Sequence, residues 1–443
     1  MTRRARVKRL LAATFLAMTL AGNITLLFIN YDTLQAARDE QLLSEARKRI
    51  LAIRRGTIEL DFGIGNASKE LIITQRSHAF RFGCNAYQYD LFNTSELNQK
   101  YNDLFSAMFN YATVPFYWTT YEWNRGEFLY EARLHNMTSW LHGFNATAKG
   151  HPIIWQSEDV VPPWMEALDQ AAQHDAALDH IDRVLAQFPE IHAWDLVNEM
   201  THVPNTWLGS TPEETWEVAV ERARAARNDC EFIANEYTIG DGQSPDPFYD
   251  FVSKVVLAGD APDALGFQFH TIEQWYPLDK LVSTLDRFGT YKIPIHITEF
   301  LPGSKGKYND GTRGGEMTEA TQAEWAARAY TMLFSHPAVD AITWWDFSDA
   351  AWSAWMAEKG AYMMAPDGRV LPVYGRLFDL VHVQWNSSCT IQLDGAGKCS
   401  FTGYYGNYSF FVEGGASGAF QIVDNRPANA RPWTTGDVYR LST

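Results

Sequence analysis

The chain has 443 residues, a formal net charge of −16 and 16 tryptophans, with an aromatic content of 14%. The strong negative charge excludes nucleic acids and other polyanions as partners, because phosphate binding needs a basic surface. It suits an exported protein that acts on a neutral or weakly charged polymer. The surplus of tryptophan predicts a large core and, in addition, flat rings on which sugars stack.

The first 30 residues predict export from the cell. Residues 1–9 carry five basic side chains, and residues 10–29 are almost wholly apolar. Such a segment is either a cleaved secretory signal peptide or an uncleaved membrane anchor. The basic flank places the rest of the chain outside the cell. We favour the anchor, because no clear small-residue cleavage site precedes Asn30.

Two further features agree with export. Seven Asn-x-Ser/Thr triplets predict N-glycosylation, with chance occurrence as the alternative. Cys389 and Cys399 flank a turn-like DGAG sequence and could form a disulfide, whereas Cys84 and Cys230 are expected to be buried free thiols. No Cys/His spacing resembles a zinc site, so neither a metal nor an organic cofactor is expected. The triplets begin at Asn23, Asn66, Asn93, Asn136, Asn145, Asn386 and Asn407.

The remainder of the chain predicts a (β/α)8 barrel with flanking pieces. Residues 31–55 are typical of a charged amphipathic helix that serves as a linker or stalk, and 56–80 contain strand-like segments. Residues 81–380 alternate strand and helix, which is the pattern of βα units. The eight candidate strands span 80–86, 111–117, 150–156, 192–198, 231–237, 264–270, 294–300 and 341–347.

Helices are expected between these strands, and the clearest are 163–187, 212–228 and 317–335. At the second of them, Thr211 is a good N-cap, Pro212 suits the first helical position and Glu214 completes a capping box. Residues 381–443 are rich in Gly, Thr, Tyr and Phe and show no helical period. They predict a small β-rich module that pairs with 56–80 and either braces the barrel or binds carbohydrate.

Two glutamates, Glu199 and Glu299, each close an apolar run that predicts a buried strand, IHAWDLVNE and IPIHITEF. A carboxylate inside a buried strand is costly unless it is paired. At the carboxyl end of a barrel strand, however, it lies on the rim where such barrels carry out catalysis. Two carboxyl groups on different strands of one barrel are what retaining glycoside hydrolysis needs. Asn198 could then bind the sugar 2-hydroxyl beside the reacting carbon. The alternative for Glu199 is a salt-bridged residue at a strand end.

These runs resemble glycoside hydrolase family 10, the endo-1,4-β-xylanases. WDLVNEM is similar to the acid/base strand of that family and HITEF to its nucleophile strand, which implies these roles for Glu199 and Glu299. The segments KGHPIIWQS, ANEY, LGFQFH and TWWDFSD resemble its third, fifth, sixth and eighth strands, so the likeness covers most of 80–380. It implies substrate-binding roles for His151, Trp155, Asn235, Tyr237, Gln268, His270, Trp345 and Trp352.

The alternative for His151 and His270 is that of satisfied core histidines. Asp195 and His296 lie inside their strands and are interpreted as members of a structural network. Glu236, at the end of the fifth strand, is a spare carboxylate for which both a site role and a structural role stay open.

The chain departs from the family pattern in two places. After the second strand the family has a Glu-Asn pair and a Lys that grip xylose, but Pro115, Phe116 and Thr119 fill those places here. Aromatic residues, Phe116, Tyr117 and Trp118, thus replace polar ones. The Asp that follows the nucleophile by two residues in the family, and orients the histidine of the sixth strand, is Leu301. The catalytic pair is intact, whereas recognition of the glycone sugars is altered.

The sequence therefore predicts a monomeric retaining β-glycanase with an α/β barrel fold and a polysaccharide substrate, xylan in the first place. One alternative is a hydrolase of the same clan that acts on another β-glycan. Another is a catalytically weak glycan-binding protein of the cell surface, against which the intact glutamate pair argues.

Overall fold

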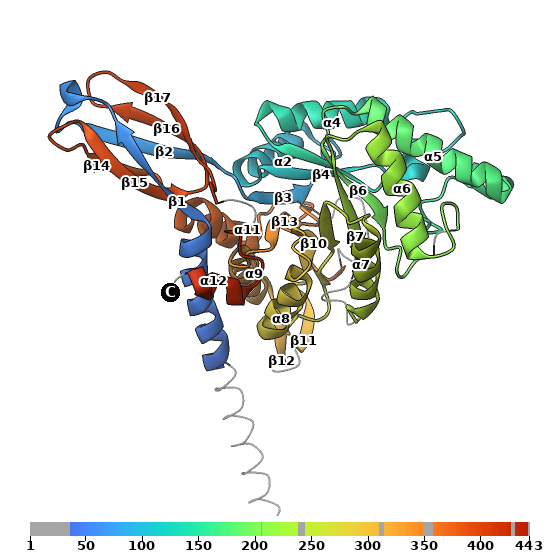
Figure 1. Ribbon diagram of the computed structural model, residues 1–443. Helices are drawn as coiled ribbons and strands as arrows, with labels where there is room; N and C mark the ends of the chain where they lie inside the picture. Colours follow the sequence, from blue (N-terminus) through green and yellow to red (C-terminus); the bar gives the residue numbers. More distant parts are fainter. Residues whose placement is uncertain are drawn as a thin grey trace, which may run out of the picture.

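The computed structural model describes residues 36–204, 206–237, 244–309, 314–348, 358–426 and 430–441. Its main body is a closed barrel of eight parallel strands, in the order β3-β4-β5-β6-β7-β8-β10-β13, with β13 paired back to β3 (Figure 1). The predicted fold class is confirmed. The barrel strands are β3 (Arg81–Asn85), β4 (Tyr111–Pro115), β5 (Thr147–His151), β6 (Ala193–Asn198), β7 (Glu231–Glu236), β8 (Ala264–Phe267), β10 (Ile295–Pro302) and β13 (Val339–Trp344).

Strand β5 begins and ends earlier than the expected 150–156. Its early end is explained by Pro152, which has no N–H to continue the ladder after His151. The chain rejoins the sheet only at Ile154, which forms a single bridge with Val197 of β6. Within β5, a Cβ at Gly150 would lie 2.0 Å from the Trp194 ring, so only glycine lets this core tryptophan pack against the strand.

Helices cover the outside of the barrel, as Figure 1 shows. Helix α6 starts as predicted: Thr211 accepts a hydrogen bond from the N–H of Glu214, and Pro212 is the first helical residue. The Glu214 carboxylate accepts hydrogen bonds from the N–H and the hydroxyl of Ser210, and not from the N–H of Thr211 as in the predicted capping box. The helices between the barrel strands and after β13 are α2 (Ser95–Met108), α3 (Trp118–Tyr121), α4 (Glu131–Gly143), α5 (Gln170–Gln187), α6 (Pro212–Ala226), α7 (Asp246–Ala258), α8 (Leu278–Gly289), α9 (Glu319–Phe334) and α11 (Pro372–Phe378).

The helix expected at 163–187 is divided into two. A short turn, η2 (Pro163–Ala167), precedes α5, and Asp169 caps α5 by accepting from the N–H of Ala172. After β10 the chain also forms a hairpin that the sequence did not predict. The remaining small elements are η1 (Ile64–Asn66), β9 (His270–Thr271), β11 (Gly306–Asn309), β12 (Gly314–Met317) and the π-helix η3 (Asp379–Gln384).

The chain segments before and after the barrel combine into a separate β-module, seen at the upper left of Figure 1. One sheet pairs β1 (Arg55–Asp61) with β15 (Lys398–Tyr404). The other has the order β14-β2-β16-β17, built from β14 (Cys389–Gln392), β2 (Glu70–His78), β16 (Gly406–Val412) and β17 (Ser417–Ile422). The expected pairing of the two flanks is therefore confirmed. Their inward side chains form a small core of their own, including Leu71, Ile73, Phe401, Tyr408 and Val412.

Two features of the flanks differ from expectation. All four cysteines are free, so Cys389 and Cys399 are not joined in the structure. The C-terminal segment is not wholly β, because it ends in a helix, α12 (Thr435–Leu441). The preceding turn is tied to the barrel, where the N–H of Thr435 donates to Asp286 of α8 at 2.6 Å.

The N-terminal helix, residues 36–53, packs against the barrel and is not a free stalk. Leu43, Ala46 and Ile50 recur at helical spacing on one face and are all buried. On the same face Arg49 donates to the hydroxyl of Ser335 at 3.0 Å, just beyond the end of α9. No helix among the described residues has the length and apolar character needed to cross a bilayer. Residues 10–29, on which the anchor prediction rests, lie outside the described residues.

Arg54 joins this helix to the underside of the barrel. Its guanidinium donates to the carbonyls of Phe334 (2.8 Å), His336 (2.8 Å) and Val339 (2.6 Å) and lies 4.7 Å from the Phe80 ring centroid. Phe334 is the last residue of α9 and His336 follows it by two residues, so the guanidinium lies at the C-terminal end of this helix, where the helix dipole favours a cation. Burial lowers the pKa of Arg54 to about 10, so the group stays charged at neutral pH.

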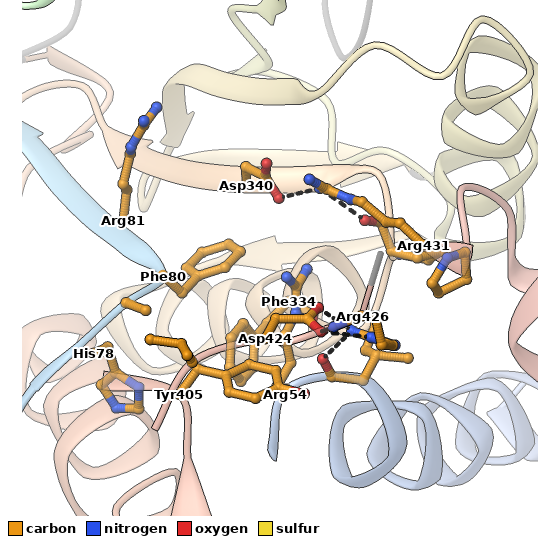
Figure 2. Close-up of a pocket in the computed structure, with 15 residues that line it drawn as sticks. Arg54, His78, Phe80, Arg81, Phe334, Asp340, Tyr405, Asp424, Arg426 and Arg431 are labelled. Carbon is orange, nitrogen blue, oxygen red and sulfur yellow. Dashed lines mark hydrogen bonds and ion pairs between the residues drawn. The ribbon is translucent and has the colours of Figure 1, made fainter. Parts of the chain in front are cut away.

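Figure 2 shows the cavity of about 290 Å³ beside Arg54. Three further arginines line it, and all are paired: Arg431 with Asp340 at 2.5 Å, Arg426 with Asp424 at 2.7 Å, and Arg81 with Glu231 at 2.6 Å. These residues belong to the barrel and to the chain after β17. The N-terminal helix, the barrel and the C-terminal segment are thus held together at one polar joint.

Replacing Arg54 by alanine is expected to lower the free energy of unfolding by about 2–3 kcal/mol, because hydrogen bonds to a charged group contribute roughly 1.5–3 kcal/mol. Arg47→Ala, on the exposed face of the same helix, is the control and should change it by less than about 0.5 kcal/mol. Urea unfolding measures both. Equal midpoints for the two variants would contradict this role of Arg54.

Candidate active site

Glu199 and Glu299 lie at the carboxyl ends of β6 and β10, as the sequence predicted from their positions. Glu199 directly follows β6 and has a left-handed backbone with φ of +56°. Few non-glycine residues adopt this conformation, and it persists only where the surroundings hold it. Here the N–H of Glu199 donates to the carbonyl of Asn235 at 2.8 Å. Glu299 is 4% exposed and belongs to β10 itself.

Three side chains surround the Glu299 carboxylate. Asn235 Nδ2 donates to Oε1 at 2.9 Å, His270 Nε2 lies 2.8 Å from Oε2, and His151 Nε2 lies 3.9 Å from Oε1. Burial by itself would raise the pKa of Glu299. The hydrogen bond from His270 and the positive charges of His151, His270 and Lys149 outweigh burial, so the pKa is lowered. The group is therefore held ionised although it is buried.

Two buried charged side chains, Asp195 and Lys149, hold His151 in position. Its Nδ1 lies 2.7 Å from Asp195 Oδ2, and the same oxygen accepts a hydrogen bond from Lys149 Nζ. Burial raises the pKa of Asp195, but the ammonium of Lys149 and the hydrogen bond to His151 bring the net pKa below its usual value. The structure thus places Asp195 in a buried network, as interpreted from the sequence, and adds Lys149, which the sequence reasoning missed. The missed signal was the spacing of Lys149 and His151, which puts both on the same face of β5.

Glu199 has the opposite electrostatic environment. Gln268 Nε2 donates to its Oε1 at 2.7 Å. Burial raises the pKa of Glu199 to about 7, with the negative charges of Glu299 and Glu236 adding to the rise and the Gln268 hydrogen bond opposing it. The pKa of Glu199 is thus raised and that of Glu299 lowered, so one site can hold a protonated acid beside an ionised carboxylate.

Asn235 is completely used within the protein. Its Nδ2 donates to both Glu299 and Asn198 Oδ1 (2.7 Å), and its Oδ1 accepts from the hydroxyl of Thr298 at 2.6 Å. It is fully buried. The geometry therefore places Asn235 between Glu299 and Asn198, where its side chain fixes the positions of both. The sequence reasoning had set it at the sugar.

Glu236 shapes the loop after β6. Its carboxylate accepts from the N–H of Thr201 at 2.9 Å and lies 2.7 Å from His202 Nδ1. The His202 ring in turn lies against Tyr237, with ring centroids 4.1 Å apart. The spare carboxylate of the fifth strand thus orders the segment that follows Glu199.

Aromatic rings form the walls of the site. The Trp345 ring is buried and meets His151 edge-on at 5.2 Å and His270 at 6.1 Å. Tyr117 meets His151 edge-on at 5.6 Å and lies 6.0 Å from Trp155. Trp352, the other predicted sugar-binding tryptophan, lies outside the described residues.

The aromatic replacements after β4 separate into two kinds. Phe116 is buried against Phe188 and Trp194, and Trp118 stacks on His180 at 4.1 Å, so both belong to the core. Only Tyr117 belongs to the site: burial raises its pKa well above the usual value, and the charges of Glu299 and Glu199 add to this. Of these three aromatic residues, Tyr117 is therefore the one that lies beside His151 and carries a hydroxyl group into the site.

The second departure also has a structural consequence. Leu301 pairs in register with His270. The Nδ1 atom of His270 is buried and has no hydrogen-bond partner among the described residues. In the family pattern an aspartate at position 301 would bind this nitrogen. Here that position is Leu301, which has no carboxylate.

His296, which was assigned to a structural network together with Asp195, lies at the opposite end of the barrel from the two glutamates. Its Nε2 is 3.0 Å from Arg81, which also pairs with Glu231. The described residues include one group with metal-ligating atoms, His192, Asp229 and Cys230. Arg227 already holds Asp229 through two hydrogen bonds of 2.7 and 2.9 Å, which explains this cluster without an ion.

Comparison with known proteins agrees with this geometry. The sequence profile of glycosyl hydrolase family 10 matches residues 73–378, more than half of the chain. The chain belongs to glycosyl hydrolase family 10. The family assignment makes the barrel that of a glycoside hydrolase, and the family is a retaining one.

Individual relatives are distant. The anti-sigma-I factor RsgI6 of Acetivibrio thermocellus is 24% identical over 414 residues, which cover 90% of this chain and 50% of that protein. Endo-1,4-beta-xylanase 2 of Arabidopsis thaliana is 26% identical over 325 residues, covering 71% of this chain and 28% of the relative. The chain thus spans half or less of the length of these two curated relatives. Xylanase 10B from Thermotoga petrophila RKU-1, solved with xylobiose, shares the fold with a TM-score of 0.58 at 22% identity, covering 69% of this chain and 95% of that one.

The raised pKa of Glu199 predicts a pH-dependent cost in stability. An acid whose pKa rises on folding loses stability as pH increases from its unfolded pKa, 4.5, through its folded value of about 7. Glu199→Gln should therefore stabilise the protein at pH 8, relative to the same comparison at pH 4, by about 2–3 kcal/mol. Urea unfolding of both proteins at the two pH values measures this. An equal difference at pH 4 and pH 8 would contradict it.

Proposed function

We propose that this chain is a retaining endo-1,4-β-xylanase that cleaves internal bonds of xylan. The carrying observation is the pair of rim glutamates with opposite pKa shifts, Glu299 lowered and Glu199 raised to about 7. Supporting it are the family assignment and the xylanases among the relatives. The substrate remains part of the proposal, because the chain covers only part of those relatives.

In this mechanism Glu299 is the nucleophile and Glu199 the general acid and base. Glu299 attacks the anomeric carbon while the protonated Glu199 gives its proton to the leaving glycosidic oxygen. A glycosyl–Glu299 ester forms, and the chain beyond the cleaved bond departs. Glu199, now ionised, then removes a proton from water, which attacks the same carbon and releases the sugar with its β configuration retained.

The neighbouring residues have separate tasks in this proposal. Asn198, His151 and Gln268 bind or orient the reacting sugar, and Trp345 forms the floor below it. His270 keeps Glu299 ionised, and Asn235 acts as a positioning residue through its bonds to Glu299 and Asn198. Trp155, Tyr237 and Trp352 complete the predicted sugar-binding set.

Tyr117 is proposed to replace the lost polar grips on the glycone side. Its ring lies beside His151, and its hydroxyl is 3.5 Å from that of Tyr87. Because the grips differ from the family pattern, side-chain tolerance on xylan is expected to differ as well. A glycan-binding protein without turnover is not favoured, since such a protein would not need two neighbouring carboxyl groups with opposed pKa shifts.

Export, anchoring through residues 10–29, N-glycosylation and a monomeric state also belong to this proposal. Export and anchoring rest on the basic residues 1–9 and the apolar residues 10–29, and N-glycosylation rests on the Asn-x-Ser/Thr triplets. Cell fractionation with an antibody against the barrel would test the first two.

The decisive test is hydrolysis of glucuronoxylan by purified 31–443, with the anomer of the first product followed by NMR. We expect β-anomer at early times. Glu299→Ala should lower kcat by more than about 10³-fold, because the nucleophile is lost. Glu221→Ala, an exposed glutamate of α6, should hydrolyse xylan at the parental rate. Absence of reducing sugar from xylan with folded protein would refute the xylanase proposal, and other β-glycans would then be assayed.

The pH profile of kcat/KM should be bell-shaped. Activity needs an ionised Glu299, whose pKa lies below 4.5, and a protonated Glu199, whose pKa is about 7. The alkaline limb should thus have its midpoint near pH 7. In Gln268→Leu this limb should shift to higher pH, since the Gln268 N–H favours the ionised form of Glu199. Gln99→Leu, on exposed α2, should leave it in place, and an unshifted limb in Gln268→Leu would argue against this assignment.

A further inference from the structure

A second groove lies at the end of the barrel opposite the glutamate pair. It has a volume of about 450 Å³ and runs between the β-module and the barrel. Segments that precede β4 and β5, including Asn110 and Asn145, line the barrel side. Those segments mark the amino ends of the strands, whereas Glu199 and Glu299 stand at the carboxyl ends. The groove is therefore separate from the active site.

The charge of this groove contrasts with that of the whole chain. Among its described lining residues there is no aspartate or glutamate, although the formal net charge of the protein is −16. Burial lowers the pKa of His78 to about 4 and also lowers that of His382, so both histidines are neutral near pH 7. The one lining side chain that carries charge at neutral pH is Arg76, and it is positive.

Arg76 is held in place on one side only. Its Nε donates to the hydroxyl of Ser409 at 2.8 Å, across from β2 to β16. It forms no ion pair with any residue that the structure describes. The guanidinium is thus oriented while its two terminal nitrogens stay available, and this fork matches the two oxygens of a carboxylate.

Uncharged polar side chains surround this arginine. Asn407 is bonded to Ser77 (2.9 Å) and to Gln421 (2.5 Å), which fixes its amide at the module side of the groove. Asn386, which also lines the groove, accepts from the N–H of Ser388 at 2.7 Å through its oxygen, so its NH₂ group is not used in this bond. Half-buried Phe144 adds an aromatic face. Amides, hydroxyls and a partly exposed ring are the groups that bind sugar hydroxyls and the apolar face of a sugar.

We propose that this groove is a non-catalytic binding site for a sugar that carries a carboxylate, namely a uronic acid branch of acidic xylan. Arg76 would pair with the carboxylate, and the flanking amides would bind the hydroxyls. The volume is within the range of small-molecule sites and holds one or two sugar rings. Holding the polymer here raises its local concentration at the active site without any change in the chemistry. The identity of the polymer rests on the proposed function, whereas the preference for a carboxylate does not.

The test is native affinity electrophoresis in gels that contain glucuronoxylan, or the same xylan after its carboxyl groups have been reduced to alcohols. Each protein carries Glu299→Gln to stop hydrolysis and comes from a host that adds no N-glycans, because a glycan on Asn145, Asn386 or Asn407 would fill the groove. The acidic-sugar site is proposed for the chain without glycans at these three residues, so N-glycosylation is expected only at the other triplets. Arg76→Gln should raise the dissociation constant for glucuronoxylan about tenfold and leave binding to reduced xylan unchanged. Retardation of the parent by glucuronoxylan should fall with added salt.

Lys69→Gln is the matched control, since it removes one positive charge from the same module just before the far end of β2. It should shift binding less than twofold. Equal retardation of Arg76→Gln and its parent in glucuronoxylan, or an equal loss in both gels, would overturn the acidic-sugar site. Arg76→Gln in the otherwise unmodified chain should hydrolyse neutral xylo-oligosaccharides at the parental rate. Absence of hydrolysis by the unmodified chain would instead refute the proposed function, independently of the gel result.

Discussion

The buried carboxylate of Glu299 is the constraint on which the rest of the site depends. An ionised group that is 4% exposed is tolerated only if charge and hydrogen bonds replace the lost water. Here His270 and Asn235 bond it directly, and the Lys149–Asp195–His151 chain brings positive charge close behind. Each of these side chains comes from a different barrel strand or its end, apart from Lys149 and His151, which share β5. A closed barrel is what brings them to one point.

Glu199 follows from the same constraint. Burial raises the pKa of Glu199, and the negative charge that Glu299 keeps adds to this rise, so the second carboxyl group on the rim is held protonated to a higher pH. The left-handed backbone of Glu199 and its bond to the Asn235 carbonyl set the direction of the side chain. Asn235 thus serves both glutamates, one through its side chain and one through its backbone. The difference between the two carboxyl groups is built into shared neighbours and not into the glutamates themselves.

Prediction from the sequence was correct for features that depend on neighbouring residues in the chain. The eight strands follow from apolar runs, the start of α6 from Thr211 and Pro212, and the position of both glutamates from the ends of their strands. It failed where only three-dimensional contacts decide. The residues around Asn235 in the sequence do not reveal that its side chain bonds to Asn198, Thr298 and Glu299. The sequence around Phe116 and Tyr117 likewise does not reveal that the Phe116 ring packs in the core and the Tyr117 ring lies in the site. The helix α12 was missed because seven residues are too few to establish a helical period, and its anchor, Asp286, lies far away in sequence.

The flanks of the barrel follow a different logic from its rim. They bring the two ends of the chain together on the amino-terminal side of the strands, where Arg54 caps the end of α9 and paired arginines close the joint. Next to that joint, the surface of β2 and β16 carries an arginine without an acidic partner among the described residues, in a groove without acidic side chains. Arg76 is exposed, so water solvates its charge and the groove does not have to supply an acidic partner. At the joint Arg426 and Arg431 are ion-paired and Arg54 is bonded to three carbonyls, whereas Arg76 is bonded to the Ser409 hydroxyl alone among the described residues. The terminal nitrogens of Arg76 are therefore open to a carboxylate, which favours a ligand over bracing as the reason for that surface.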